Sequence, residues 1–143
     1  MIKIDLEKTP FQNIIDLING SSTHTFSESD LLISDPTLIT PQGRNNTRIT
    51  ISPSSTGSIR GEPIIRRYRR LDLSSDLPNK QSTYIVQQGT DREAIEELIK
   101  TGLGLHSQST FMFNWTNPLR PTISSHQNDY LYTGQKEITI VYQ

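Results

Sequence analysis

Short runs in which apolar residues alternate with polar ones are the main pattern of this chain. Such runs cover Met1–Leu6 and Arg48–Ser52, and each predicts a β-strand. A further strand is expected over Ile64–Leu73, where Pro63 marks either its start or a sheet edge. Because a turn-rich stretch separates the last two segments, we expect them to form a hairpin with a long loop.

Two other segments have apolar residues at helical spacing. The first helix is expected to follow Thr9, which suits an N-cap, with Pro10 at the first helical position. The second is expected over Thr90–Lys100, where Thr90 caps the helix and Glu93 supplies the acid of a capping box. The apolar faces are formed by Phe11, Ile14, Ile15 and Ile18 in the first helix and by Ala94, Ile95, Leu98 and Ile99 in the second.

The remaining segments complete a mixed fold. A short strand is expected over Ser82–Gln87, and Leu131–Tyr142 closes the chain with Ile138 and Ile140 on one face. The polar stretch Ser74–Gln81 is the best linker candidate. Together these elements predict an α+β fold, mostly antiparallel sheet with one helix per unit. Its two strand–helix–β-hairpin units would cover residues 1–73 and 82–143, with a linker over 74–81.

The two predicted units resemble each other. A shift of 81 residues aligns helix positions in the two halves: Thr9 with Thr90, Ile14 with Ile95, Leu17 with Leu98, and Ile18 with Ile99. We interpret the match as a degenerate internal duplication. The alternative is chance, because strand–helix–hairpin units are common.

Composition narrows the class of protein. The chain has 18 Ile and 13 Leu but a single Ala, which argues against a helical bundle, since helix propensity and close helix packing favour Ala. Ser and Thr contribute 16 residues each, which is typical of strands and turns with one solvated face, or of a subunit completed by its neighbours. The absence of cysteine excludes disulfides and thiolate metal sites. No apolar run is long enough for a transmembrane helix, so we expect no membrane contact.

Few residues suggest catalysis. The three histidines, His24, His106 and His126, have no metal-ligand spacing and no recognisable carboxylate neighbour. Phosphate-binding glycine loops and activated nucleophiles are also missing from the sequence pattern. We therefore expect neither an enzyme nor a bound metal, cofactor or small-molecule substrate.

The strongest charge feature is basic. Seven of the fourteen cationic residues lie between residues 44 and 70, where Glu62 is the only acid, so this segment carries about +6 and the rest about −7. The arginines are Arg44, Arg48, Arg60, Arg66, Arg67, Arg69 and Arg70. One strand face with Arg66, Tyr68 and Arg70 could pair with an acidic neighbouring subunit. It could also be a solvated face that blocks aggregation, or bind a phosphate backbone with Tyr68 stacking on bases.

A cluster of aromatic residues follows the second predicted helix. Phe111, Phe113 and Trp115 alternate along the chain. The spacing predicts a core or a strand face, and an exposed cluster would be an interface anchor.

One stretch of the chain runs Gly43-Arg-Asn-Asn-Thr-Arg-Ile-Thr-Ile51, and a second is Tyr68-Arg-Arg-Leu-Asp-Leu73 after a turn and Gly61. Together they resemble a small uncharacterised domain family of tailed-bacteriophage virion structural proteins, mostly from large contractile-tailed phages. An extra Asn after Arg44, together with Pro63 and additional arginines, departs from the family pattern. The resemblance implies virion assembly and no known enzymatic activity.

The resulting hypothesis is a structural subunit of a tailed bacteriophage virion, in the capsid, neck, tail or baseplate. It would be assembled in the host cytoplasm and act through multi-copy contacts with other virion subunits and copies of itself. The predicted interface residues are Arg44, Arg48, Arg66, Arg67, Tyr68, Arg69 and Arg70. The alternative is a nucleic-acid-associated accessory protein that uses the basic strand Arg66–Arg70; the net charge of −1 argues against a dedicated nucleic-acid binder.

Overall fold

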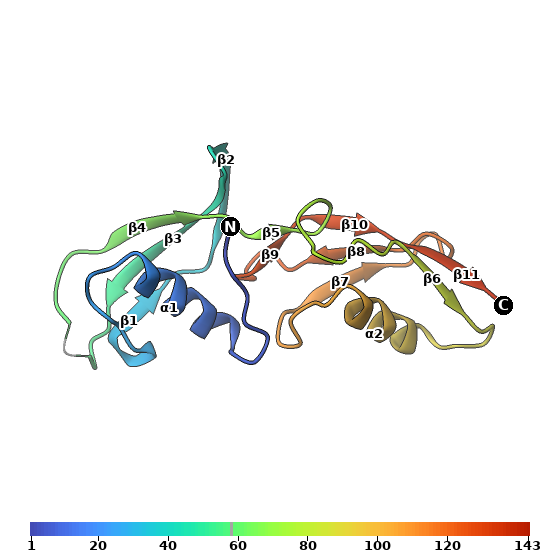
Figure 1. Cartoon of the computed structure of the whole chain (residues 1–143), viewed down its shortest axis with the longest axis horizontal. Helices are drawn as coiled ribbons and strands as arrows, with labels where there is room; N and C mark the ends of the chain where they lie inside the picture. Colours follow the sequence, from blue (N-terminus) through green and yellow to red (C-terminus); the bar gives the residue numbers. More distant parts are fainter. Residues whose placement is uncertain (58) are drawn as a thin grey trace. The chain divides into compact units, whose positions relative to one another are not determined.

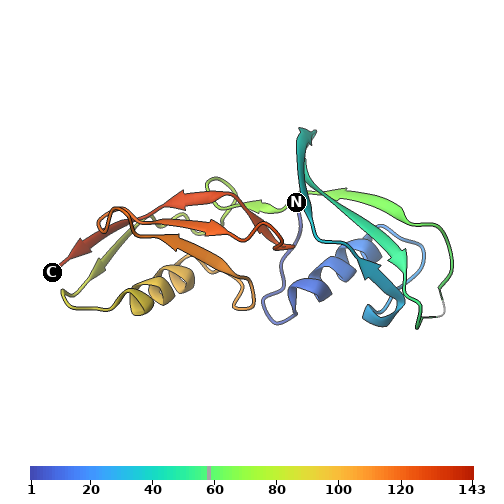
Figure 2. The same ribbon diagram turned by 180° about the vertical axis from the view of Figure 1, so that it is seen from behind.

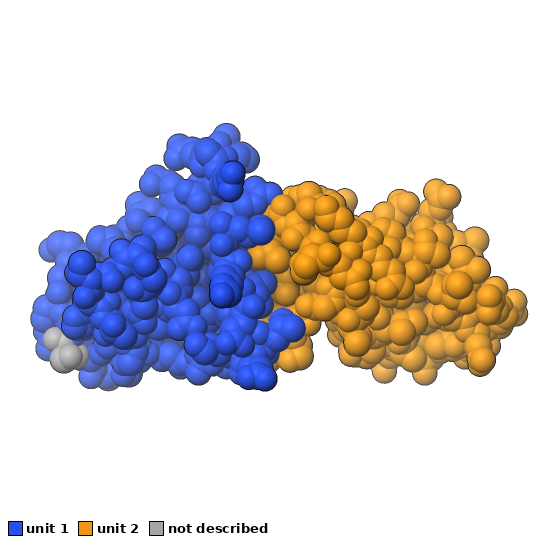
Figure 3. Space-filling view, viewed as in Figure 1, with its two compact units in different colours: residues 1–70, 127–131 blue, residues 71–126, 132–143 orange. Residues whose placement is uncertain are grey.

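A computed structural model describes residues 1–57 and 59–143 of the chain (Figure 1). Its helices and mostly antiparallel strands confirm the predicted α+β class. The chain forms two compact units, coloured separately in Figure 3. Unit 1 consists of Met1–Arg70 and Gln127–Leu131, and unit 2 of Leu71–His126 and Tyr132–Gln143.

These bounds differ from the expected units 1–73 and 82–143. The first unit ends three residues earlier than expected and gains a loop from the second half of the chain. Residues 74–81, expected to be a linker, belong to unit 2, where Leu77 is buried.

Helix α1 (Pro10–Gly20) of unit 1 begins where the sequence predicts. The Thr9 hydroxyl accepts a hydrogen bond from the Gln12 backbone N–H at 3.0 Å. In return, the Gln12 side-chain oxygen accepts one from the Thr9 backbone N–H at 2.9 Å. The predicted Thr9 cap is therefore confirmed, as part of a complete capping box.

The sheet of unit 1 is built around one long strand. The elements after α1 are a 3-10 turn (Glu28–Asp30), β1 (Leu31–Ile33), β2 (Thr37–Gln42), β3 (Asn45–Pro53) and β4 (Ile64–Tyr68). Strand β3 pairs antiparallel with β4 along one edge and with β1 and β2 along the other. The expected hairpin between Arg48–Ser52 and the strand that starts at Ile64 is confirmed.

Two expected strands of the first unit are shorter or missing. The strand expected over Ile64–Leu73 is divided. Strand β4 ends at Tyr68, because the backbone N–H of Arg70 donates to the side chain of Asn46 in β3 and not to a β3 backbone oxygen, and Leu71–Asp72 forms a separate short strand in unit 2. The strand expected over Met1–Leu6 is wrong. Its Ile2 is buried and donates one backbone hydrogen bond to Arg69 O at 2.9 Å, but the segment forms no ladder among the described residues.

Helix α1 covers one face of this sheet, as Figures 1 and 2 show from opposite sides. Ile14, Ile15 and Ile18 of the helix are buried, as are Ile49 and Ile51 of β3. The predicted helical apolar face therefore packs in the core of unit 1. We call the helix-covered side of this sheet the inner face, and the opposite side the outer face.

Unit 2 combines the second helix with short strands. They are β5 (Leu71–Asp72), β6 (Thr83–Val86), α2 (Arg92–Gly102), β7 (Phe111–Asn114), β8 (Thr122–Ser125), β9 (Tyr132–Thr133), β10 (Gln135–Glu137) and β11 (Thr139–Tyr142). Strands β7, β8 and β10 form an antiparallel sheet, while β6 pairs parallel with β11 and β5 with β9. The side chains of Ile95, Ile99, Ile138 and Ile140 are buried, as expected.

The start of α2 corrects one expectation. The N-cap is Asp91, whose carboxylate accepts from the Ala94 backbone N–H at 2.8 Å, and not Thr90. The hydroxyl of Thr90 instead donates to Gln87 O in the preceding turn at 2.7 Å.

The internal duplication stays a prediction. Buried isoleucines at 14 and 18 in α1 and at 95 and 99 in α2 keep the offset of 81 residues. The helix caps, Thr9 and Asp91, are instead 82 residues apart. The two units also differ in their strands, because unit 1 contains β2 and unit 2 contains the parallel strand β6.

Candidate functional site

The strand face with Arg66, Tyr68 and Arg70 is turned toward the core of unit 1. Arg70 is only 2% exposed. Its Nε donates to Thr47 Oγ1 at 2.8 Å, and its Nη1 donates to the backbone oxygens of Asp129 at 2.9 Å and Gln127 at 3.1 Å. The guanidinium therefore joins β3 to the loop 127–131, which completes unit 1.

The backbone of Arg70 is held by hydrogen bonds to the side chain of Asn46. Asn46 Oδ1 accepts from the Arg70 N–H at 2.9 Å, and Asn46 Nδ2 donates to Arg70 O at 3.1 Å. The Thr47 hydroxyl in turn donates to Asn46 Oδ1 at 2.8 Å. Burial lowers the pKa of Arg70, since it penalises the charged form.

Tyr68 also serves the fold of unit 1. It is 3% exposed, and its hydroxyl donates to Tyr130 O at 2.8 Å. Burial raises the pKa of this hydroxyl well above its ordinary value. Tyr68 and Arg70, two of the predicted interface residues, are thus buried and hold unit 1 together.

The outer face of the same sheet carries the exposed arginines. Arg48 of β3 and Arg67 of β4 are directly opposite each other in the antiparallel register. Both side chains are exposed, and neither forms an ion pair or hydrogen bond with any residue that the structure describes. Leu32 of β1 and Ile65 of β4 are 58% and 55% exposed, on strand positions that share this face. We call Leu32, Arg48, Ile65 and Arg67 the outer-face patch.

The other predicted interface residues lie at the margins of this sheet. Arg44 is exposed in the β2–β3 turn, and its backbone oxygen accepts from Arg69 Nη1 at 3.4 Å. Arg69 itself is half-buried. Arg66 faces inward next to Ile49 in the register and lies at the wall of a groove. The predicted arginines therefore lie in three places: in the core of unit 1 (Arg70), on the outer face of the sheet (Arg48 and Arg67), and at the margins of the sheet (Arg44, Arg66 and Arg69).

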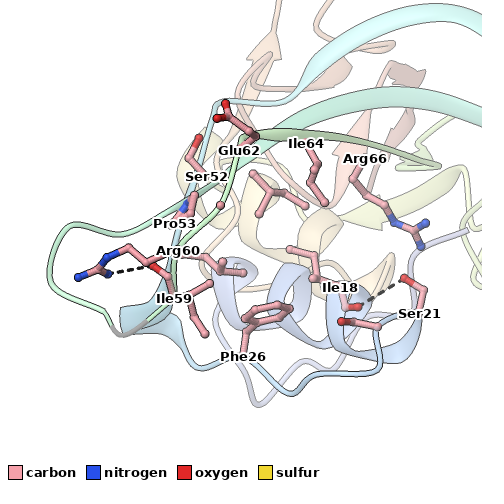
Figure 4. Close-up of a pocket in the computed structure, with 14 residues that line it drawn as sticks. Ile18, Ser21, Phe26, Ser52, Pro53, Ile59, Arg60, Glu62, Ile64 and Arg66 are labelled. Atoms are coloured by element: carbon pink, nitrogen blue, oxygen red, sulfur yellow. Dashed lines mark hydrogen bonds between the residues drawn. The ribbon is translucent and has the colours of Figure 1, made fainter.

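That groove holds about 350 Å³ (Figure 4). It lies between the C-terminal end of α1, marked by Ile18 and Ser21, and strand β4. Its apolar lining includes Ile18, Phe26, Leu31, Ile51, Ile59 and Ile64. Arg66 contributes a guanidinium whose buried Nε has no hydrogen-bond partner among the described residues. The sequence offered no signal for this groove, because residues far apart in the chain form it.

The aromatic cluster of unit 2 packs on helix α2. Trp115 Nε1 donates to Glu96 Oε2 at 2.8 Å, and the Arg92 guanidinium lies 5.2 Å from the centre of the Trp115 ring. Phe111 and Phe113 are half-buried on β7. Trp115 therefore contacts α2, while Phe111 and Phe113 lie on one face of β7, as the spacing predicts.

The structure adds little to the search for catalytic or metal chemistry. Across residues 1–57 and 59–143, no group of three or more His, Cys, Asp or Glu side chains is placed to hold a metal ion. His106 is buried in unit 2, where its Nδ1 accepts from the Gln108 backbone N–H at 3.0 Å. Neither helix in the described part of the chain has the length and apolar character needed to span a bilayer.

Comparisons with protein-family models, with curated proteins and with solved structures find no match to this chain. The geometry of unit 1 and the sequence resemblance are therefore the basis for a functional proposal.

Proposed function

We propose that this chain is a structural subunit of a tailed bacteriophage virion that works through contacts with other virion subunits and with copies of itself. The sequence resemblance around Gly43–Ile51 and Tyr68–Leu73 supports the virion context. The observation that carries the interaction role is the pairing of Arg48 with Arg67 on the outer face of unit 1.

Two like charges directly opposite each other in a sheet repel and destabilise it. An acidic partner that places a carboxylate between Arg48 and Arg67 removes this repulsion and gains two charge-assisted hydrogen bonds. The exposed Leu32 and Ile65 beside them supply apolar area for the same contact. The outer-face patch thus combines the apolar surface and the charge of a protein interface.

The chain itself offers acidic surface for contacts between copies. Glu93 and Glu97 lie on helix α2 and are exposed. A basic patch in one copy and acidic residues in another suit a head-to-tail contact, which builds rings or filaments.

The test removes the outer-face charges. The double variant Arg48→Thr, Arg67→Thr should be depleted from purified particles of the phage that encodes the chain, and should self-associate less in sedimentation velocity. The control variant Lys80→Thr, Arg120→Thr loses the same charge from exposed positions of unit 2 and should behave as the wild type. Normal incorporation and association of the outer-face variant would refute the proposal.

The same variants distinguish the nucleic-acid alternative. With Tyr68 buried, base stacking by that ring is no longer available, and binding would rest on Arg48 and Arg67 with phosphates. Fluorescence anisotropy with nonspecific duplex DNA should therefore show weak binding with a shallow salt dependence. A steep fall in affinity with salt, lost in the outer-face variant, would favour the alternative instead.

A further inference from the structure

Strand β4 is an open edge of the unit 1 sheet. It pairs with β3 along one side, and no strand among the described residues pairs with the other side. Figures 1 and 2 show β4 at the margin of the sheet in both views. Ile64 and Ile65 on this edge are 59% and 55% exposed. An exposed apolar edge presents unpaired backbone groups that can accept another strand.

The groove lies directly beside this open edge. Ile64 and Arg66 line it, and they are two residues apart on β4, so both side chains point to the inner face. A strand added to β4 would therefore place every second side chain over the groove. An apolar side chain next to Ile64 would enter the pocket around Ile18 and Phe26. The next inward side chain would lie next to Arg66.

The guanidinium of Arg66 determines which side chain fits at that second position. Its Nε–H is buried and has no hydrogen-bond partner in residues 1–57 and 59–143, which is a cost that a bound acceptor would remove. A carboxylate is the acceptor that best fits a guanidinium, because it matches both charge and geometry. In Figure 4 the Arg66 guanidinium lies beside Ser21 at one end of the groove.

From these observations we propose that the edge of β4 and its groove bind an extended segment of a partner protein by strand addition. The segment has an apolar residue for the groove and, two residues away, an acidic residue for Arg66. The backbone hydrogen bonds supply general affinity, and the two side-chain positions supply specificity. This site uses the free backbone edge and the inward side chains of β4, whereas the outer-face patch uses the outward side chains of the same sheet.

A synthetic peptide tests the proposal in either strand direction. In acetyl-Thr-Glu-Thr-Leu-Thr-Glu-Thr-amide, one Glu reaches Arg66 whichever way the peptide runs when Leu faces the groove. Titrated into the full chain and followed by NMR, it should shift and protect from exchange the amides of Ile64–Tyr68. Replacing both Glu by Gln, or Leu by Ala, should each weaken binding by about tenfold or more.

Two further comparisons separate strand addition from simpler binding. Two versions of the peptide carry N-methyl groups on alternate residues, one on the odd and the other on the even positions. If the peptide adds to β4 as a strand, one version must lose binding, because its blocked amides are those that face β4. The variant Arg66→Gln should abolish the preference for Glu over Gln, while Arg92→Gln in unit 2 should preserve it. Equal binding of all N-methylated peptides, or shifts outside β4 and the groove, would overturn the proposal. Tighter binding of octanoate at the same amides would overturn it in favour of a small-molecule site.

Discussion

The Nε–H of Arg70 donates to Thr47 Oγ1 at 2.8 Å, with both side chains buried in unit 1. We predict that Thr47→Val, which keeps the shape but removes the acceptor, lowers the free energy of unfolding by about 1–3 kcal/mol. The variant Thr47→Ser keeps the hydroxyl and should cost less. Chemical denaturation measures both values. A larger loss in Thr47→Ser than in Thr47→Val would show that the methyl group, and not the hydrogen bond, stabilises this position.

The cap of α2 allows a comparison between two adjacent residues. Asp91→Ala should lower stability by about 0.5–2 kcal/mol, because the carboxylate accepts from the Ala94 N–H. Thr90→Ala should cost less, because its hydroxyl bonds only to Gln87 O in the preceding turn. Thermal melts of the two variants rank them, and the reverse order would place the cap at Thr90.

Local signals explain why the helices could be predicted. The Thr9-Pro10 start and the apolar spacing of α1 act within one or two turns of chain, so they are visible in the sequence. The N-cap of α2 was not visible in the same way, because Thr and Asp both suit an N-cap and the preceding turn decides between Thr90 and Asp91. The strand expected over Met1–Leu6 failed for a related reason: its alternation is local, but a ladder needs a partner.

Neighbouring positions of α2 differ sharply in burial. Ile99 is fully buried, whereas Leu98 is 45% exposed. Ile99→Ala should cost about 2–5 kcal/mol through lost burial and a cavity, and Leu98→Ala less than about 1 kcal/mol. Urea unfolding curves would measure the two changes. Similar losses for both would mean that Leu98 is covered in solution, for example by self-association.

Tyr68 gives the chain a distinct alkaline response. Its pKa is raised in the folded state by burial, so the unfolded chain loses the proton first, near its ordinary pKa of about 10. The contribution of Tyr68 to stability should therefore be constant up to about pH 9 and fall as the pH rises further. Tyr68→Phe should flatten this fall, while losing about 0.5–1.5 kcal/mol at neutral pH with the hydrogen bond to Tyr130 O.

Stability measured against pH checks this prediction, with Tyr142→Phe as the control. Tyr142 is half-buried and belongs to β11 of unit 2. An identical alkaline fall in Tyr68→Phe and the wild type would assign the response to other groups.

The candidate site was only partly visible in the sequence. The alternation correctly places Arg66 and Tyr68 on one face of β4, whereas Arg70 lies after the end of the strand. The sequence does not say which face is covered. The loop 127–131, about sixty residues away, decides this by accepting hydrogen bonds from Tyr68 and Arg70. The arginine run therefore predicted a basic surface, but the exposed pair in that surface is Arg48 and Arg67. Their juxtaposition depends on the register of the β3–β4 hairpin.

That pair leads to a prediction in which stability and association change in opposite directions. Arg48 and Arg67 face each other across β3 and β4 without an ion-pair partner in the described residues. Replacing both by Thr should raise the free energy of unfolding of the isolated chain by about 0.2–1 kcal/mol, because like charges no longer oppose each other. The wild type should also gain stability when salt is added, and the variant less so, because ions screen the exposed repulsion.

The control Lys80→Thr, Arg120→Thr should leave both the stability and its salt dependence unchanged. A loss of stability in the Arg48→Thr, Arg67→Thr variant would mean that the arginine stems support the fold of unit 1. In that case repulsion between Arg48 and Arg67 would no longer support the interface role, even if association also fell.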